Sequence, residues 1–139
     1  MRRVFLDANV LFSAAYRRDS GLRLWDLPET RLLTSAYTAE EARRNLDLPE
    51  QRTRLDALLD RTLLVAESTV SLPEGIDLPE KDQPILKAAL AANATHLVTG
   101  DVRDFGRYFG RRLLGILIIL PADLIRSRTG SRRSRTGSR

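Results

Sequence analysis

The sequence predicts an α/β fold, in which helices cover both faces of a central, mainly parallel sheet. Short apolar runs alternate with segments in which apolar residues recur at helical spacing, a pattern typical of an α/β sandwich. Two of the runs end in acids: residues 4–6 lead directly into Asp7, and residues 97–98 are followed by Thr99, Gly100 and Asp101. Because sites in parallel sheets form beyond the carboxyl ends of strands, these acids mark a predicted crevice.

Composition narrows the class of protein. The chain has 139 residues, 42% of them hydrophobic, which suits one soluble domain with a real core. It has no cysteine, so disulfides and thiolate metal sites are excluded and a cytoplasmic location is expected. No segment approaches the ~20 consecutive apolar residues of a membrane span, and we expect no membrane association.

The net positive charge of the chain comes from its last 14 residues. Residues 126–139 read RSRTGSR twice and hold six arginines and no acid. Without them, 17 basic residues face 18 acidic ones. We therefore expect one nearly neutral domain over residues 1–125 and a disordered, low-complexity tail over 126–139. Two interpretations of the tail stay open: a nonspecific nucleic-acid contact, or a repeat without an evolved role.

In the first half of the chain, strands are predicted at residues 3–6, 31–35 and 62–66. Helices are predicted at residues 8–18, 38–46 and about 50–60, with a break at Ser20-Gly21 and a short apolar segment at 22–27. Thr38 and Glu41 have the spacing of a capping box, so Thr38 is the expected start of its helix.

In the second half, two prolines and a glycine predict a loop over residues 67–80. Asp82 is the expected N-cap of a helix that runs to Asn93. A strand is predicted at 96–99 and a short aromatic turn or helix at 105–109. The apolar run 113–120 is predicted to be an edge or final strand, followed by a last turn at 121–125.

Five acids stand where these elements begin or end: Asp7, Glu41, Asp82, Asp101 and Asp104. Element ends on one side of a parallel sheet lie close together, so we expect the acids to converge. Clustered carboxylates repel one another and call for a cation. Oxygen ligands suit Mg²⁺ or Mn²⁺.

Each acid also has a simpler interpretation. Asp7 could be a turn residue, Glu41 a cap partner, Asp82 only an N-cap and Asp104 only the start of the next helix. Glu40 is an alternative to Glu41, although Glu41 shares its helical face with Asn45. It is the position of all of them at element ends that favours a site.

Four segments together resemble a PIN domain, the nuclease fold of VapC-type toxins. They are VFLDANVLFSA at 4–14, EEARRNL at 40–46, KDQPILKAALAANATHLVTGDVRDF at 81–105 and GILIILPADLI at 115–125. The resemblance implies a nuclease that holds Mg²⁺ or Mn²⁺ and cuts single-stranded or structured RNA. It also implies frequent homodimers and neutralisation by an antitoxin protein that inserts into the site.

The resemblance assigns roles to particular residues. Asp7, Glu41, Asp82 and Asp101 would be catalytic and metal-binding, with Asp104 as an accessory metal ligand. Asn9 and Thr99 would position the acids or a water. Ala8 stands where many members have threonine, which removes a hydroxyl but no ligand.

The expected activity is therefore that of a metal-dependent endoribonuclease, in which a metal-activated water hydrolyses RNA. Candidate contacts to the RNA backbone are the arginines at positions Arg17, Arg18, Arg43, Arg44 and Arg103. The main alternative is a catalytically silent PIN module that binds RNA or a protein partner. A phosphotransfer domain is disfavoured, because Asn9 and Glu67 stand where such domains need aspartate.

Overall fold

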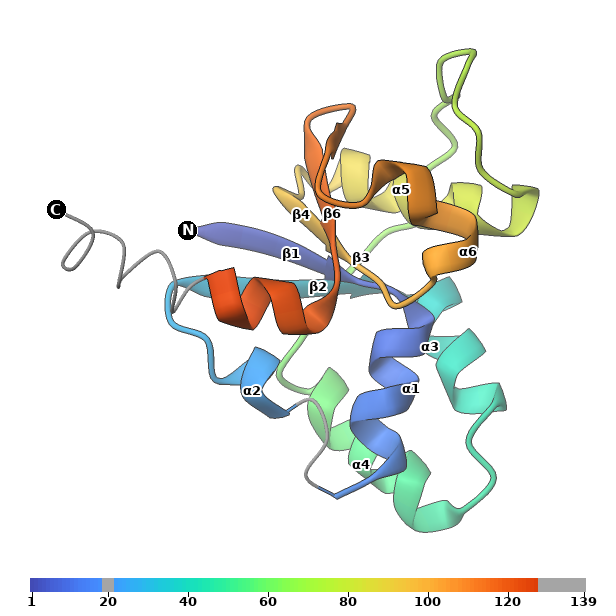
Figure 1. Cartoon of the computed structure of the whole chain (residues 1–139). Coiled ribbons are helices and arrows are strands. Elements are labelled where there is room, and N and C mark those ends of the chain that lie inside the picture. The colour runs from blue at the N-terminus through green and yellow to red at the C-terminus, as the bar shows by residue number, and fades with distance from the viewer. Residues whose placement is uncertain (19–21, 128–139) are drawn as a thin grey trace, which may run out of the picture.

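The computed structural model describes residues 1–18 and 22–127. The predicted break at Ser20-Gly21 and most of the predicted tail lie outside these residues. The described chain contains a six-stranded sheet of order β3-β2-β1-β4-β6-β5 (Figure 1). Its strands are β1 Arg2–Leu6, β2 Thr30–Ser35, β3 Leu63–Val65, β4 His96–Val98, β5 Arg112–Leu113 and β6 Ile116–Ile119. All pairs are parallel except β5 with β6, so the predicted fold class is confirmed.

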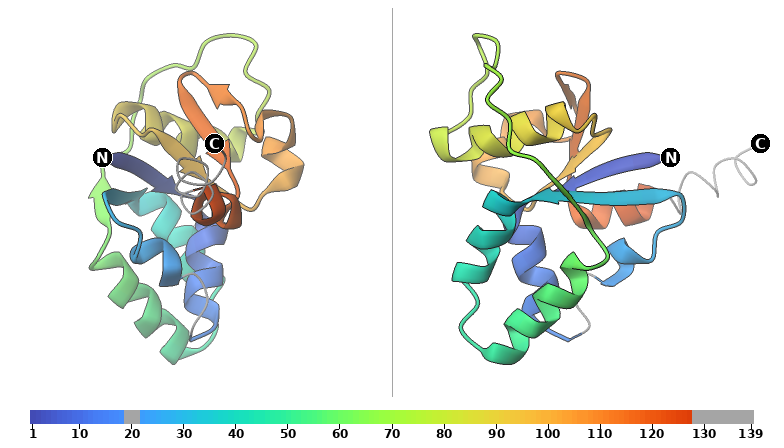
Figure 2. Two further views of the ribbon diagram at one scale, coloured as in Figure 1. Left: turned by 60° about the vertical axis from the view of Figure 1, so that its left-hand side comes forward. Right: turned by 180° about the vertical axis from the view of Figure 1, so that it is seen from behind.

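Helices cover both faces of the sheet (Figures 1 and 2). One face carries α1 Ala8–Tyr16, α2 Leu22–Trp25, α3 Ala36–Arg44 and α4 Pro49–Leu59. The other carries α5 Gln83–Ala91 and α6 Val102–Phe105, with the 3-10 turns η1 Glu80–Asp82 and η2 Gly106–Tyr108. None of the described helices is long and apolar enough to cross a membrane.

The alternation of side chains along β1 divides the core in two. Val4 and Leu6 pack with Leu11 of α1 in one cluster, whereas Phe5 packs with Leu86 of α5 in the other. All of these side chains are buried, as expected of a parallel strand covered on both faces. Each contributes about 1.5–3 kcal/mol through burial, so β1 is firmly held on both sides.

The strand order reverses next to β1. The chain proceeds from β1 outward through β2 to β3, and then crosses to β4 on the other side of β1. Leu6 is in register with Val98, and the amide of Asp7 donates to the carbonyl of Val98. The carboxyl ends of β1 and β4 therefore open side by side at the reversal point, where open α/β sheets bind ligands.

The predicted capping box at Thr38 is wrong. Helix α3 begins at Ala36, and the hydroxyl of Ser35 accepts from the amide of Thr38. Thr38 is fully buried, and its hydroxyl is paired with that of Ser35. Ser35 is the better cap because its extended backbone at the end of β2 aims the hydroxyl at the first turn. Glu41 consequently lies in the second turn of α3.

The apolar run 113–120 is not one strand. β5 and β6 form a hairpin whose two turn residues, Leu114 and Gly115, have φ of 52° and 87°. Two left-handed residues are typical of a tight hairpin turn. β6 is the final strand, but it lies inside the sheet and β5 forms the edge. Residues 121–127 are helical rather than a single turn.

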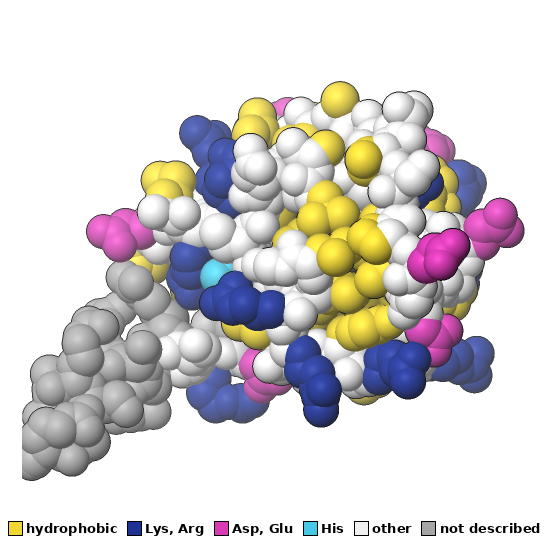
Figure 3. Space-filling view, turned by 90° about the horizontal axis from the view of Figure 1, so that it is seen from above, with side chains coloured by type: hydrophobic (Ala, Val, Ile, Leu, Met, Phe, Trp, Pro, Cys, Tyr) yellow, Lys and Arg dark blue, Asp and Glu magenta, His cyan; other side chains and the backbone are white. Residues whose placement is uncertain are grey.

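The surface seen from above in Figure 3 has hydrophobic side chains gathered at its centre and charged side chains around them. Leu114 of the hairpin turn and Val70 of the long loop are among the exposed hydrophobic residues of the described chain.

Candidate active site

A pocket of about 380 Å³ opens at the reversal point of the sheet. Four of the five predicted acids line it, and they come from four different places in the fold. Its lining consists of Asp7, Ala8, Asn9, Phe12, Glu41, Asn45, Lys81, Asp82 and Asp101. The structure therefore brings together acids that lie as far as 94 positions apart in the sequence.

Asp7 is fixed by hydrogen bonds to both carboxylate oxygens. It is 3% exposed and lies at the N-terminus of α1, where Oδ1 accepts from the amide of Ala8 at 2.7 Å. Oδ2 accepts from the hydroxyl of Thr99 at 2.7 Å and from the side-chain amide of Asn9 at 3.2 Å. Burial raises the pKa of Asp7, the bonds from Thr99 and Ala8 lower it, and Glu41 and Asp101 raise it again.

The same bonds tie the ends of β1 and β4 together. The hydroxyl of Thr99, which is fully buried, also accepts from the amide of Asp101 at 3.0 Å. The side-chain oxygen of Asn9 accepts from the amide of Gly100 at 2.7 Å. A Cβ at position 100 would lie 3.2 Å from that oxygen, so glycine allows this close approach. Asn9 and Thr99 thus contact Asp7, as expected of residues that position the acids.

Asp82 is held quite differently. It precedes α5 at the predicted N-cap position, but its side chain makes no capping hydrogen bond. It is 4% exposed, and its Oδ2 has no hydrogen-bond partner within the described chain. Burial, and next the adjacent carboxylate of Asp104, raise the pKa of Asp82 to about 7. A buried carboxylate oxygen without a donor is costly, and it is the kind of atom that a cation would satisfy.

Asp82, Asp101 and Asp104 form a tight group. Each offers one carboxylate oxygen, and these atoms all lie within 4.8 Å of one another. Asp101 is placed by capping α6, since its Oδ1 accepts from the amide of Asp104 at 3.0 Å. An all-oxygen donor set with one unpartnered buried oxygen fits Mg²⁺ or Mn²⁺. These three aspartates would hold the ion.

Lys81 lies against this group. Its Nζ donates to Oδ2 of Asp104 at 2.8 Å, and lies 3.6 Å from Asp82 and 3.9 Å from Asp101. This bond is the main cause that lowers the pKa of Asp104 to about 2. The contact with Asp104, followed by the charges of all three aspartates, raises the pKa of Lys81.

Glu41 and Asp104 lie at the borders of the pocket. Glu41 is half-buried and faces it from α3, next to Asn45, whose side chain donates to the carbonyl of Glu41 at 3.0 Å. Glu41 is not among the three acids whose oxygens gather within 4.8 Å. Asp104 borders a neighbouring pocket together with Arg103 and Arg107.

The chain matches a known protein family. Residues 3–103 match the model of the PIN domain family. The chain belongs to the PIN domain family. The match includes four of the five acids and ends just before Asp104. No curated protein sequence matches the chain.

Two solved structures share the PIN fold. VapBC2 from Rickettsia felis, bound to a DNA fragment from their promoter, has a TM-score of 0.61 at 18% identity over 84% of this chain and 96% of that one. VapBC-1 from nontypeable Haemophilus influenzae has a TM-score of 0.55 at 19% identity over 86% and 98%. At these identities the likeness concerns the fold alone.

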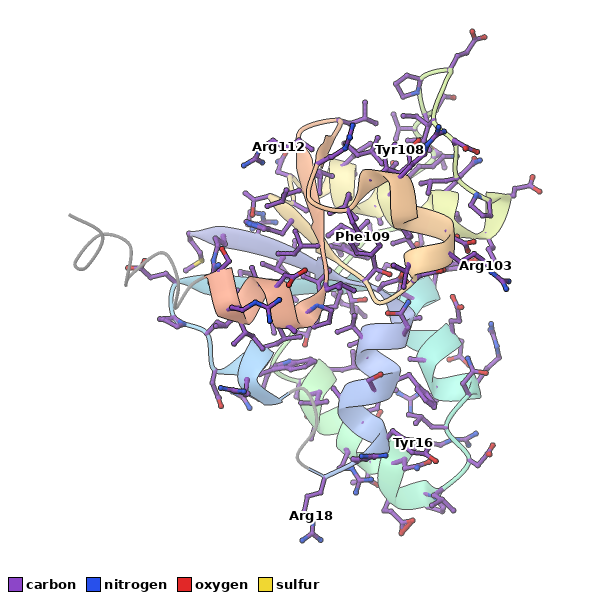
Figure 4. The ribbon with its side chains drawn as sticks, in the orientation of Figure 1. Tyr16, Arg18, Arg103, Tyr108, Phe109 and Arg112 are labelled. Atoms are coloured by element: carbon purple, nitrogen blue, oxygen red, sulfur yellow. The ribbon has the colours of Figure 1, made fainter. Side chains whose placement is uncertain are left out.

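The predicted RNA-binding arginines of this PIN domain are scattered. Arg18 lies beyond the end of α1 that is remote from the acids, whereas Arg103 lies on α6 beside them (Figure 4). Arg17 borders a shallow pocket with Phe12, Ser13 and Tyr16. Arg44 is exposed at the end of α3, and Arg43 is paired there with Asp56. Arg103 thus borders a pocket together with Asp104.

Lys81 and Phe12 also line the pocket, although neither was predicted from the sequence. Lys81 is one of only two lysines in a chain with 21 arginines, and that rarity was an available signal. Phe12 follows Asn9 by three positions on α1 and lines the same pocket. Its ring stacks on that of Tyr16, with centroids 5.3 Å apart and an interplanar angle of 29°.

Proposed function

We propose that this PIN domain is a metal-dependent endoribonuclease of the VapC type. The observation that carries the proposal is the group of Asp82, Asp101 and Asp104 at the pocket of the sheet's reversal point, in which the buried Oδ2 of Asp82 has no hydrogen bond within the described chain. Family membership and the shared fold support the nuclease class. Every predicted acid is present at the pocket or beside it, which argues against a catalytically silent module.

The chemistry would be hydrolysis of a phosphodiester. A bound divalent cation would lower the pKa of a water and offset charge on the phosphate and the leaving oxygen. Asp82, Asp101 and Asp104 would hold that cation, while Asp7 and Glu41 would orient the water from the opposite wall. Water would attack phosphorus in line, and the bond to the 3′ oxygen would break. The products would be a 5′-phosphate and a 3′-hydroxyl.

The surface around the pocket favours single-stranded RNA. Phe12 lines the acid pocket and also, with Tyr16 and Arg17, the shallow pocket beside it. Aromatic faces of this kind stack unpaired bases, and an adjacent arginine can contact the backbone. Arg103 would supply a backbone contact from α6. Since residues 1–125 are nearly neutral, their affinity for RNA should be modest, and because arginine contacts to phosphate would supply it, binding should weaken as salt rises.

A protein partner is also proposed. Two solved structures with this fold are VapBC assemblies, and by analogy an antitoxin would cover the acid pocket of this chain. A homodimer would follow the same analogy. Addition of such a partner should stop cleavage without removing metal.

The test is cleavage of a labelled single-stranded RNA by the purified protein in Mn²⁺, in Mg²⁺ and in EDTA. Asp101→Asn keeps the oxygen that caps α6 and removes the charge, so the fold should persist and cleavage should fall by at least about 100-fold. Asp77→Asn is the matched control, because Asp77 is exposed and paired with Arg107 outside the acid pocket. Cleavage that survives EDTA or Asp101→Asn would refute the proposal. Metal binding at the acids without cleavage of any RNA tested would instead support the silent module.

A further inference from the structure

We propose that Lys81 is an internal counter-ion that competes with the metal for the acid site. The inference rests on the proposed function, because it requires that Asp82, Asp101 and Asp104 bind a divalent cation. In the metal-free protein, the ammonium of Lys81 offsets part of their negative charge. When the metal binds, the ammonium leaves the three carboxylates and remains at the pocket, where it can face a phosphate.

The ammonium of Lys81 lies close to all three carboxylates. Nζ of Lys81 lies 2.8, 3.6 and 3.9 Å from carboxylate oxygens of Asp104, Asp82 and Asp101. The same three residues supply the oxygens that gather within 4.8 Å. A metal ion held by them would stand within a few ångströms of the ammonium, and two cations so close repel each other strongly. Lys81 and the metal therefore exclude each other.

The second step concerns the freedom of the lysine side chain. The backbone of Lys81 is anchored, since its carbonyl accepts from the hydroxyl of Tyr37 at 3.1 Å. Its side chain is 64% exposed, so no packing holds the ammonium on the acids. An ammonium on a flexible stem can move between two partners at little cost. One hydrogen bond to Asp104 and the attraction of the three carboxylates hold it there, and a divalent ion offers the acids a stronger attraction.

Position 81 holds a lysine, although most basic residues of the chain are arginines. The chain uses arginine for 21 of its 23 basic residues and lysine for two. A guanidinium at position 81 would bind carboxylates through two parallel hydrogen bonds and release them less readily than a single ammonium. Lysine is therefore the residue that suits a displaceable cation.

The experiment is calorimetric titration of Mn²⁺ into the full chain. Two neutral variants, Lys81→Met and Lys81→Gln, should each bind Mn²⁺ about tenfold more tightly than the parent protein, because a competing positive charge is gone. Lys81→Arg keeps the charge and should bind no more tightly than the parent. Lys87→Met is the matched control on α5, away from the pocket lining, and should match the parent.

Thermal unfolding supplies a readout independent of affinity. In EDTA both neutral variants should melt at a lower temperature than the parent, and saturating Mn²⁺ should raise their Tm by more. Unchanged or weaker Mn²⁺ binding in the two neutral variants would overturn the inference. If Asp101→Asn still abolished binding in that case, the metal site and the proposed function would stand without it. If no protein in the series bound Mn²⁺, both would fall together.

Discussion

Asp7 and Asp82 are buried in the wall of the same pocket, yet their carboxylates are held in different ways. Three donors from Ala8, Asn9 and Thr99 satisfy both oxygens of Asp7. Within the described chain, one carboxylate oxygen of Asp82 has no hydrogen bond, and the ammonium of Lys81 lies 3.6 Å from it. At the β1 side the hydrogen bonds of Asp7 are thus satisfied within the protein, whereas the side at α5 and α6 has an unsatisfied carboxylate oxygen that a cation would complete.

This difference follows from how each side is built. Asp7, Thr99 and Gly100 lie at the ends of two paired strands, where backbone register fixes their positions. Asp82 and Asp104 lie in η1 and α6, two short elements that no strand pairing holds. The ammonium of Lys81 lies against both of their carboxylates. We infer that the β1 side positions the reacting groups and the α5 side responds to metal.

The largest effect should come from breaking the hydrogen bonds of the β1 side. Thr99→Val removes the donor to Asp7 and the acceptor for the amide of Asp101. Loss of such supporting contacts costs about 10–100-fold in activity or metal affinity, and the unpaired buried groups cost about 1–3 kcal/mol of stability. Thr99→Ser keeps the hydroxyl and should retain most activity. Cleavage rates and denaturant unfolding measure both effects; full activity in Thr99→Val would show that the hydroxyl is dispensable.

At the α5 side, removing the charge of Asp82 should have a smaller effect, and it should stabilise the protein, whereas Thr99→Val destabilises it. Since the pKa of Asp82 is raised from 3.8 to about 7 in the folded state, its contribution to stability is present below 3.8 and is lost as pH rises through 7. Asp82→Asn removes the charge and should raise Tm in EDTA at pH 8 by roughly 2–6 °C, with less gain at pH 5.

Asp7→Asn is the comparison for that measurement. The pKa of Asp7 is also raised by burial, but hydrogen bonds from Thr99 and Ala8 offset part of the effect. The gain in Tm at pH 8 should therefore be smaller than for Asp82→Asn. An equal gain in both variants would remove the distinction between the two sides of the pocket.

The smallest expected effect is the release of protons when Mn²⁺ binds. Metal binds the ionised carboxylate, so Mn²⁺ binding at pH 6 should release about one proton, mainly from Asp82, and close to none at pH 8.5. Titrations in buffers of different ionisation enthalpy count these protons. Asp82→Asn should abolish the release at pH 6. Release that is the same at both pH values would show that Asp82 is not the group concerned.

The sequence was most informative where strands set the geometry. The apolar runs before Asp7 and Asp101 predicted two strands of a parallel sheet whose acids share one crevice, because strand ends have few alternative arrangements. Helix starts were harder to predict. Ser35 and Thr38 are both good caps, and only the length of β2 decides between them.

The α5 side could be predicted only in part. Its acids were recognised, but a lysine before a helix has many ordinary roles, and its contact with Asp104 spans 23 positions. Nor could periodicity divide residues 113–120, since the turn at Leu114 and Gly115 interrupts a continuous apolar run. Such features depend on side chains meeting in three dimensions and leave little trace in local sequence.

The central claim is that a cation completes the α5 side of the pocket. Its most direct test is a crystal structure with Mn²⁺, in which anomalous scattering locates the ion. The account predicts a peak among the carboxylates of Asp82, Asp101 and Asp104, with Nζ of Lys81 beyond about 3.5 Å from Asp104 and so no longer hydrogen-bonded. A peak elsewhere, or Lys81 still bonded to Asp104 beside the ion, would contradict it.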